Sequence, residues 1–368
     1  MQFGFSRHSI ARYAAQPENN YLLLRFVAAL LVIYGHAYAI APQPGGMDLI
    51  QRVFGVTYAG DVGVYTFFLI SGFLVTGSYL NRANFGDYLK CRLLRLLPGL
   101  AVCLAFTVFV LGPLVSRLPA GAYFAEADTY HYFTANLSLI KTVYTLPGVF
   151  EHFPQDGAVN GSLWTLPAEF RLYLLVGLIG VTSLLARRRW YIWLALALAA
   201  VSLFTPPDMA LMFNKYPLRS LFLYFLAGSV LRVYWDLVPL SGLILAAFAV
   251  ADFFLRHTAA YPAALGVTLG YAVLWVAYVP NLHAFNRVGD YSYGLYIYAF
   301  PVAQVLRQYF IHIRPLELFA WGAVLTLACA ALSWHLVEEP TLRWKRVDFS
   351  GQLLRLWRHR PASAHTEE

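Results

Sequence analysis

Two ionisable side chains, Arg25 and His36, lie within the first hydrophobic stretch of the sequence. Only uncharged residues separate them, and an ionisable group at membrane depth is costly enough to be a functional-site hypothesis by default. Their spacing of eleven residues is close to three helical turns, so both should project from nearly the same face, roughly 16 Å apart along the axis. The pair therefore predicts a fixed cation at one depth and a titratable imidazole at another.

The fourth hydrophobic stretch adds a carboxylate and a phenol, Glu169 and Tyr173, at the spacing of one helical turn. If that stretch enters the membrane from outside, Glu169 lies at a depth comparable to that of His36, and the two residues could face one cavity. Glu169 would then orient His36. The simpler interpretation is that Glu169 pairs with Arg171 or with another helix.

These side chains need a membrane around them, and the composition indicates one. Hydrophobic residues make up 59% of the 368 residues and charged residues 12%, with a mean hydropathy of +0.56, far from a typical soluble domain. The sequence divides into about ten stretches near the length needed to cross a bilayer. We therefore predict an all-α, polytopic integral membrane helix bundle with about ten transmembrane helices, at 22–41, 62–80, 95–115, 164–186, 190–206, 217–234, 238–255, 261–280, 290–310 and 316–337.

Basic residues predict the orientation of this bundle. With both termini in the cytoplasm, about seventeen Lys and Arg residues fall on the inner side and about eight on the outer side, as the positive-inside rule requires. The net charge of +8 is then explained by orientation and contact with lipid head groups, and no nucleic-acid partner is expected. The expected location is the bacterial inner membrane.

We predict two domains. Residues 1–340 form one transmembrane domain with a long external loop at about 116–163, and residues 341–368 form a cytoplasmic basic tail. Tyr and Phe residues accompany acidic residues in the loop, which suits either a bound sugar or anchoring at the membrane interface. The three cysteines, Cys91, Cys103 and Cys329, show no CxxC spacing, so no metal site is predicted.

A cluster of arginines on the cytoplasmic side could hold a phosphorylated cofactor. Arg92 and Arg95 follow the second predicted helix, and Arg25 enters the membrane from the same side. A guanidinium group matches phosphate oxygens in charge and geometry, although positive-inside anchoring is an alternative for Arg92 and Arg95. Glu338 or Glu339 could hold one of these arginines in place.

An ordered set of motifs resembles the membrane acyltransferase-3 family over nearly the whole chain. The motifs are Leu24-Arg25-Phe26-Val27-Ala28-Ala29-Leu30-Leu31-Val32 ending in His36, Thr66-Phe67-Phe68-Leu69-Ile70-Ser71-Gly72-Phe73-Leu74, Arg92-Leu93-Leu94-Arg95-Leu96-Leu97-Pro98, Ser162-Leu163-Trp164-Thr165-Leu166 with Glu169, Tyr291-Ser292-Tyr293-Gly294-Leu295-Tyr296-Ile297-Tyr298 with Pro301, and Ser333 with Glu338-Glu339-Pro340.

The resemblance implies a stand-alone O-acyltransferase that moves an acyl group, usually acetyl, from cytoplasmic acyl-CoA to a cell-surface or exported polysaccharide. In that family an arginine and a histidine in the first helix are the functional signature, and Arg25 and His36 match it. One departure lies after Tyr298, where family members often carry a histidine and this chain has Ala299-Phe300-Pro301.

Acyl transfer to a sugar hydroxyl needs a base for the proton and donors for the oxyanion. His36 suits the base, because a buried histidine without a carboxylate beside it stays neutral. Arg25, Arg92 and Arg95 are the candidate cofactor-binding residues, and Ser71, Trp164 and Tyr173 the candidate substrate contacts. No Gly-x-Ser-x-Gly elbow is present, so direct transfer is favoured over a covalent intermediate, with Ser71 an outside candidate nucleophile. The alternatives are a transporter or flippase of a lipid-linked glycan and, third, a glycan polymerase.

Overall fold

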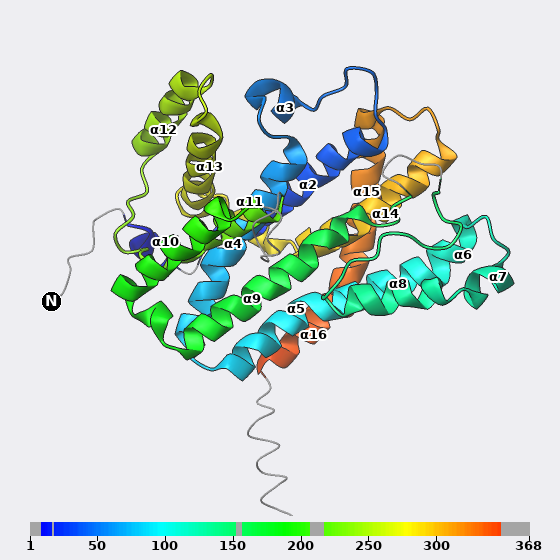
Figure 1. Ribbon diagram of the computed structural model, residues 1–368, viewed down its shortest axis with the longest axis horizontal. Helices are drawn as coiled ribbons and strands as arrows, with labels where there is room; N and C mark the ends of the chain where they lie inside the picture. Colours follow the sequence, from blue (N-terminus) through cyan, green and yellow to red (C-terminus); the bar gives the residue numbers. More distant parts are fainter. Residues whose placement is uncertain (1–8, 17, 152–156, 207–216, 347–368) are drawn as a thin grey trace, which may run out of the picture.

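The computed structural model describes residues 9–16, 18–151, 157–206 and 217–346. Within these ranges the chain is helical and contains no β-strand (Figure 1). The main helices are α2 (Tyr21–Ile40), α4 (Ala59–Arg82), α5 (Phe85–Phe106), α9 (Thr165–Val181), α10 (Arg188–Phe204), α11 (Leu218–Val233), α12 (Gly242–Leu255), α13 (Tyr261–Tyr278), α14 (Ser292–Tyr309) and α15 (Pro315–Ser333).

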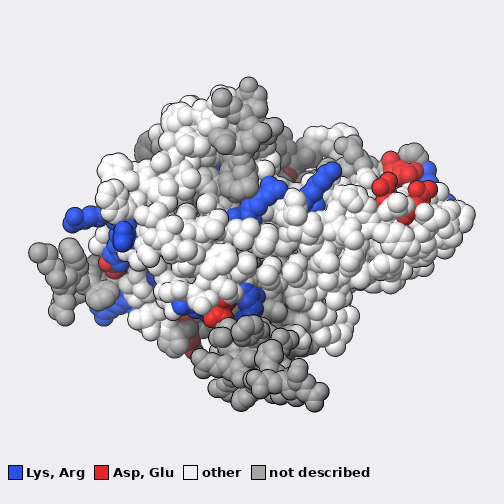
Figure 2. Space-filling model, turned by 60° about the horizontal axis from the view of Figure 1, so that its bottom comes forward, with Lys and Arg blue, Asp and Glu red and all other residues white. Residues whose placement is uncertain are grey.

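Six helical segments of the described chain are long and apolar enough to cross a membrane. They are Tyr21–Ile40, Ala59–Arg82, Phe85–Val115, Gly161–Val181, Tyr261–Tyr278 and Pro315–Arg343. Helices α10, α11 and α12 have only 17, 16 and 14 residues, below the length of about 20 that spans a bilayer upright. The helical class is thus confirmed, whereas the count of about ten stays a prediction. Most of the described surface in Figure 2 is uncharged, as a lipid-facing protein requires.

Helix α4 runs through the centre of the bundle and packs most closely against α2 and α11. Glycines make this approach possible, because a Cβ on Gly72 would collide with the carbonyl oxygen of Phe225, and one on Gly228 with that of Leu69. Small residues at helix interfaces let the backbones of membrane helices approach each other. The tight contact fixes α4, which carries residues of the candidate site.

The predicted external loop contains secondary structure of its own. Helices α7 (Ala120–Ala125) and α8 (Ala127–Leu137) occupy its first half. Tyr123 and Tyr132 are fully buried in the main core cluster, so these two rings serve neither sugar binding nor interface anchoring. Of the predicted basic tail, only residues 341–346 lie within the described chain.

The chain changes its winding at the end of α15. A π-helical turn, η5 (Trp334–Glu338), leads into α16 (Glu339–Arg343) and the short η6 (Trp344–Arg346), and all three elements contact α5. Such π turns occur frequently at functional sites, and this one ends at Glu338.

Candidate active site

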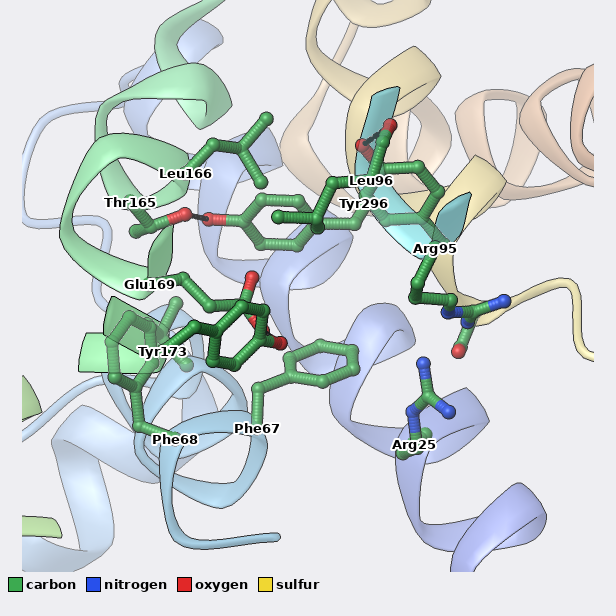
Figure 3. A pocket seen from close by; sticks show the side chains of 13 residues that line it. Arg25, Phe67, Phe68, Arg95, Leu96, Thr165, Leu166, Glu169, Tyr173 and Tyr296 are labelled. Atoms are coloured by element: carbon green, nitrogen blue, oxygen red, sulfur yellow. Dashed lines mark hydrogen bonds between the residues drawn. The ribbon is translucent and has the colours of Figure 1, made fainter. Parts of the chain in front are cut away.

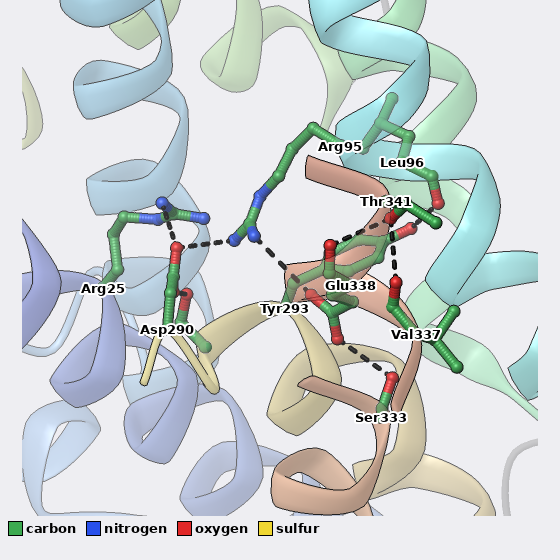
Figure 4. Close-up of polar contacts among 10 residues, drawn as sticks. Arg25, Arg95, Leu96, Asp290, Tyr293, Ser333, Val337, Glu338 and Thr341 are labelled. Carbon is green, nitrogen blue, oxygen red and sulfur yellow. Dashed lines mark hydrogen bonds and ion pairs between the residues drawn. The ribbon is translucent and has the colours of Figure 1, made fainter. Parts of the chain in front are cut away.

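Four charged residues form one network between the N-terminal part of α2, the middle of α5, the loop before α14 and the end of η5 (Figure 4). Asp290 accepts from both Arg25 and Arg95, at 2.8 Å each. Arg95 also lies 3.5 Å from Glu338, whose carboxylate accepts a hydrogen bond of 2.9 Å from Ser333. The side chains are 24% (Arg25), 12% (Arg95), 16% (Asp290) and 3% (Glu338) exposed. Two cations and two carboxylates therefore balance in a largely buried cluster.

The contact between Arg95 and Glu338 agrees with the prediction that Glu338 or Glu339 would hold an arginine. Asp290 was not identified from the sequence, although it stands directly before the Tyr291-Ser292-Tyr293 motif. Ser292 donates a hydrogen bond of 2.6 Å to the other oxygen of Asp290. The position of Asp290 directly before this motif is thus the sequence feature that could have identified it as a site residue.

A small cavity opens beside this network and extends along the inner faces of α4, α9 and α14 (Figure 3). Its volume is about 70 Å³, several times the 10–15 Å³ that one water occupies on the same measure. Its walls are formed by Arg25, Val64, Phe67, Phe68, Arg95, Leu96, Thr165, Leu166, Glu169, Tyr173, Ser292, Tyr293 and Tyr296. The cavity is therefore apolar along much of its wall, with cations at one end.

Glu169 joins a hydrogen-bonded group at the wall of this cavity. The Tyr173 hydroxyl donates a short hydrogen bond to Glu169, and Ser71 Oγ lies 3.3 Å from the same carboxylate oxygen and 3.2 Å from the Tyr173 hydroxyl. The structure thus brings three predicted site residues together. It shows no contact between Glu169 and His36 among the described residues, because a shared depth does not fix the direction in which each helix face points.

His36 does not line this cavity. Its ring packs edge-on against Phe300, with ring centroids 5.2 Å apart. Tyr296, which lines the cavity, precedes Phe300 by one turn of α14, about 6 Å along the axis. Nδ1 of His36 is buried and has no hydrogen-bond partner among the described residues. A buried unpaired nitrogen is costly, so it calls for an explanation.

Between Tyr296 and α9 the cavity presents two hydroxyl groups. Those of Thr165 and Tyr296 are 2.7 Å apart, and either can be the donor. Sequence reasoning did not select either residue, although both belong to quoted motifs. Trp164, which it did select, packs against the main core cluster and does not line the cavity.

Uncompensated cations gather next to the balanced network. The Arg92 guanidinium carbon lies 5.8 Å from the centre of the Tyr173 ring, and Arg92 Nε is buried without a hydrogen-bond partner in the described chain. Lys345 lies on η6, which packs against α5. Burial, followed by the positive charges of Arg92, Arg95 and Arg82, lowers the pKa of Lys345 to about 8. This region would gain from a bound anion.

A family model described as an acyltransferase domain matches residues 20–335. The chain belongs to this acyltransferase-3 family. The match includes Arg25, His36 and Asp290 and ends before Glu338 and Lys345.

Curated relatives cover most of this acyltransferase. An "O-acetyl transferase" of Shigella phage Sf6 is 29% identical over 342 residues, or 86% of this chain and 94% of the relative. "Nodulation protein 10" of Rhizobium leguminosarum bv. viciae is 30% identical over 366 residues, or 90% of this chain and 95% of the relative. No solved structure gives a significant match.

These findings confirm the resemblance and the predicted enzyme class, an acyltransferase of the O-acetyltransferase type. With six helices suited to crossing a membrane, the acyltransferase is a multi-pass membrane protein. The transporter alternative is not favoured.

Proposed function

We propose that the protein transfers an acetyl group from cytoplasmic acetyl-CoA to a hydroxyl of a cell-surface or exported polysaccharide. The observation that carries the proposal is the order of groups along the bundle. Uncompensated cations, the ion-pair network, the small cavity and His36 follow one another from the N-terminal part of α2 towards its C-terminal end. A donor can thus enter at one end while an acceptor enters at the other.

The donor binds through its phosphates on the cytoplasmic side. Arg92 and Lys345 supply cations without carboxylate partners among the described residues, while Arg25 and Arg95 line the cavity entrance. The cavity volume of about 70 Å³ suits an acetyl thioester and not a long acyl chain. The name of the phage relative supports the same acyl group.

The reaction takes place beside Tyr296, the lining residue of the cavity that lies one turn of α14 from Phe300, against which His36 packs. The acceptor hydroxyl oxygen attacks the thioester carbon, and Nδ1 of His36 takes the hydroxyl proton. The C–O bond forms, the C–S bond breaks, and the proton passes from His36 to the CoA sulfur. Thr165 and Tyr296 supply O–H donors to the oxyanion. Glu169, held by Tyr173 and Ser71, shapes the cavity wall beside the acyl group.

Activity is tested in proteoliposomes that contain the purified protein. The proteoliposomes in which the predicted cytoplasmic face points outwards receive radiolabelled acetyl-CoA outside and contain a polysaccharide acceptor inside. The polysaccharide should then carry labelled, base-labile ester. Octanoyl-CoA should be a donor at least about tenfold worse, because its chain exceeds the cavity. If acetyl-CoA is not consumed while glycan still crosses the membrane, the proposal fails.

The orientation has its own test. We propose an inner-membrane location with both termini in the cytoplasm, supported by the distribution of basic residues. Alkaline phosphatase fused after Glu368 should then be inactive, and fused after Gly157 it should be active. The reverse pattern would overturn the assignment of donor and acceptor sides.

A further inference from the structure

A second and much larger cavity lies on the other side of α4. Its volume is about 1310 Å³, above the usual range of about 300–1,000 Å³ for small-molecule pockets. Helices α4, α10, α11, α12 and α13 form its walls, and α3 (Leu49–Phe54) borders one end. Leu69, Leu223 and Phe248 are typical of its largely apolar lining. It shares no residue with the candidate active site.

One carboxylate lies within this apolar lining. Asp252 on α12 is 9% exposed, and its Oδ1 is buried without a hydrogen-bond partner among the described residues. A carboxylate with a purely structural task would have a partner here, since an unpaired buried oxygen is costly. Asp252 is therefore an acceptor that faces a cavity and lacks a donor.

A cation stands one turn further along the same helix face. Arg256 also lines the cavity, at the end of the α12–α13 hairpin, and its guanidinium carbon lies 5.7 Å from the Phe253 ring centre. It forms no ion pair within the described ranges. The cavity thus presents a cation at its rim and an acceptor one turn deeper.

The two cavities lie back to back across a single helix. Val64, Phe67 and Phe68 of α4 face the small cavity, whereas Val62, Tyr65 and Leu69 of the same helix face the large one. A helix with its side chains is about 10–12 Å across. Figure 1 shows the α12–α13 hairpin standing apart from the rest of the bundle beside α4. A molecule held in the large cavity is thus within one helix diameter of the candidate active site.

We propose that this cavity holds the hydrocarbon chain of a glycolipid acceptor, with Arg256 binding an anionic group of the head and Asp252 accepting a hydrogen bond from an amide N–H or hydroxyl at the root of the chain. The assignment of this lipid as the acceptor rests on the proposed acyl transfer. The apolar lining matches the chain, and the order of Arg256 and Asp252 matches an anion with a donor beneath it. An ordinary ester-linked phospholipid has no donor at that depth.

Photolabelling of the full-length protein in nanodiscs tests this assignment without any turnover. The probes are N-hexadecanoyl-glucosamine 1-phosphate and phosphatidylglycerol, each with a diazirine at the same position of the chain. The wild type should be labelled on α10–α13 about tenfold more by the amide-linked probe, the usual worth of a hydrogen bond to a charged group. Equal labelling by both probes, or none on these helices, would overturn the proposal.

Three variants test which residues of the cavity determine the labelling. Asp252→Leu should abolish the preference between the probes, because it removes the acceptor and keeps the size. Ala227→Trp, at an exposed residue of the cavity wall, should lower labelling by both probes, because the indole occupies space that the hydrocarbon chain needs. Ala247→Trp, at an exposed residue of α12 outside the lining, is the control and should change labelling by neither probe. If Asp252→Leu still prefers the amide-linked probe, Asp252 does not have the proposed role. Because labelling needs no acetyl-CoA, failure of the acyl-transfer proposal is detected separately, by the turnover assay.

Discussion

The two ends of the arginine and histidine pair in α2 have opposite surroundings. Arg25 lies among partners, since Asp290 accepts its hydrogen bond and is itself shared with Arg95. His36 has an aromatic ring beside it and a buried nitrogen with no partner among the described residues. Arg25 is thus fixed by ion-pair partners, whereas Nδ1 of His36 has no partner among the described residues.

The difference indicates that the charges around Asp290 stabilise the fold, whereas the His36 imidazole is able to accept a proton. Buried ions persist only when partners offset the cost of removing them from water, and the network around Asp290 provides such partners. A histidine that was merely packed would have both ring nitrogens bonded or exposed. We therefore expect loss of the shared carboxylate of Asp290 to affect folding and substitution of His36 to affect turnover.

The largest effect is expected at His36. Replacement by alanine should slow acetyl transfer by about two to four orders of magnitude, the usual contribution of a positioned base, and leave acetyl-CoA binding nearly unchanged. A turnover assay and calorimetry on the solubilised variant measure the two quantities. Near-normal turnover in a folded His36→Ala protein would show that His36 is a packing residue and that the open nitrogen has no chemical role.

Removal of Asp290 should mainly destabilise the protein. Asp290→Ala leaves Arg25 and Arg95 facing each other without their shared carboxylate, which for a buried pair costs about 3–5 kcal/mol. Thermal unfolding in detergent measures the loss. The matched control is Asp236→Ala, which breaks an ion pair of equal length, 2.8 Å, whose arginine is 44% exposed, and which should cost at most about 1 kcal/mol. Equal losses in both variants would contradict a special role of the network.

Arg25 sharpens the comparison, because it belongs to the network and also lines the cavity. Arg25→Ala leaves Asp290 paired with Arg95, so the protein should fold, but its dissociation constant for acetyl-CoA should rise about tenfold or more, the value of one charged hydrogen bond. Arg25→Lys should recover only part of the affinity, since it lacks the guanidinium fork. Unchanged affinity in Arg25→Ala would restrict Arg25 to a structural role.

The smallest effect is a pH dependence at Lys345. Its pKa of about 8 means that it loses its charge as the pH rises from 7 to 9, so wild-type affinity for CoA should fall several-fold over that range. Lys345→Met should bind more weakly at pH 7 and show little of this dependence. A flat wild-type profile would remove Lys345 from the anion site.

The free energy of unfolding should change with pH in the direction opposite to the affinity for CoA. The lysine pKa in the unfolded chain is about 10.4, so between pH 8 and 10 the unfolded state binds more protons than the folded state. Ligand-free wild-type protein should therefore become more stable as the pH rises through this window. The melting temperature of Lys345→Met should lack this component.

The sequence identified the family and the helical class because these depend on local runs of residues, and the roles it assigned to Arg25, His36 and Glu169 stay predictions. It missed Asp290, since nothing in the sequence near Arg25 indicates a partner 265 residues away. It estimated the depths of Glu169 and His36 from helix rise, but which face each helix turns towards its neighbours depends on packing. Asp252 was missed for the same reason, because only the arrangement of α10–α13 shows that its oxygen is unpaired.

The glycine contact between α4 and α11 has a mechanical consequence. Two helices whose backbones touch at Gly72 and Gly228 cannot slide past each other without a collision, so the partition between the two cavities is rigid. The α12–α13 hairpin touches the rest of the bundle mainly through α13. Entry and exit of a lipid should therefore depend on α12 and leave the contact between α4 and α11 in place.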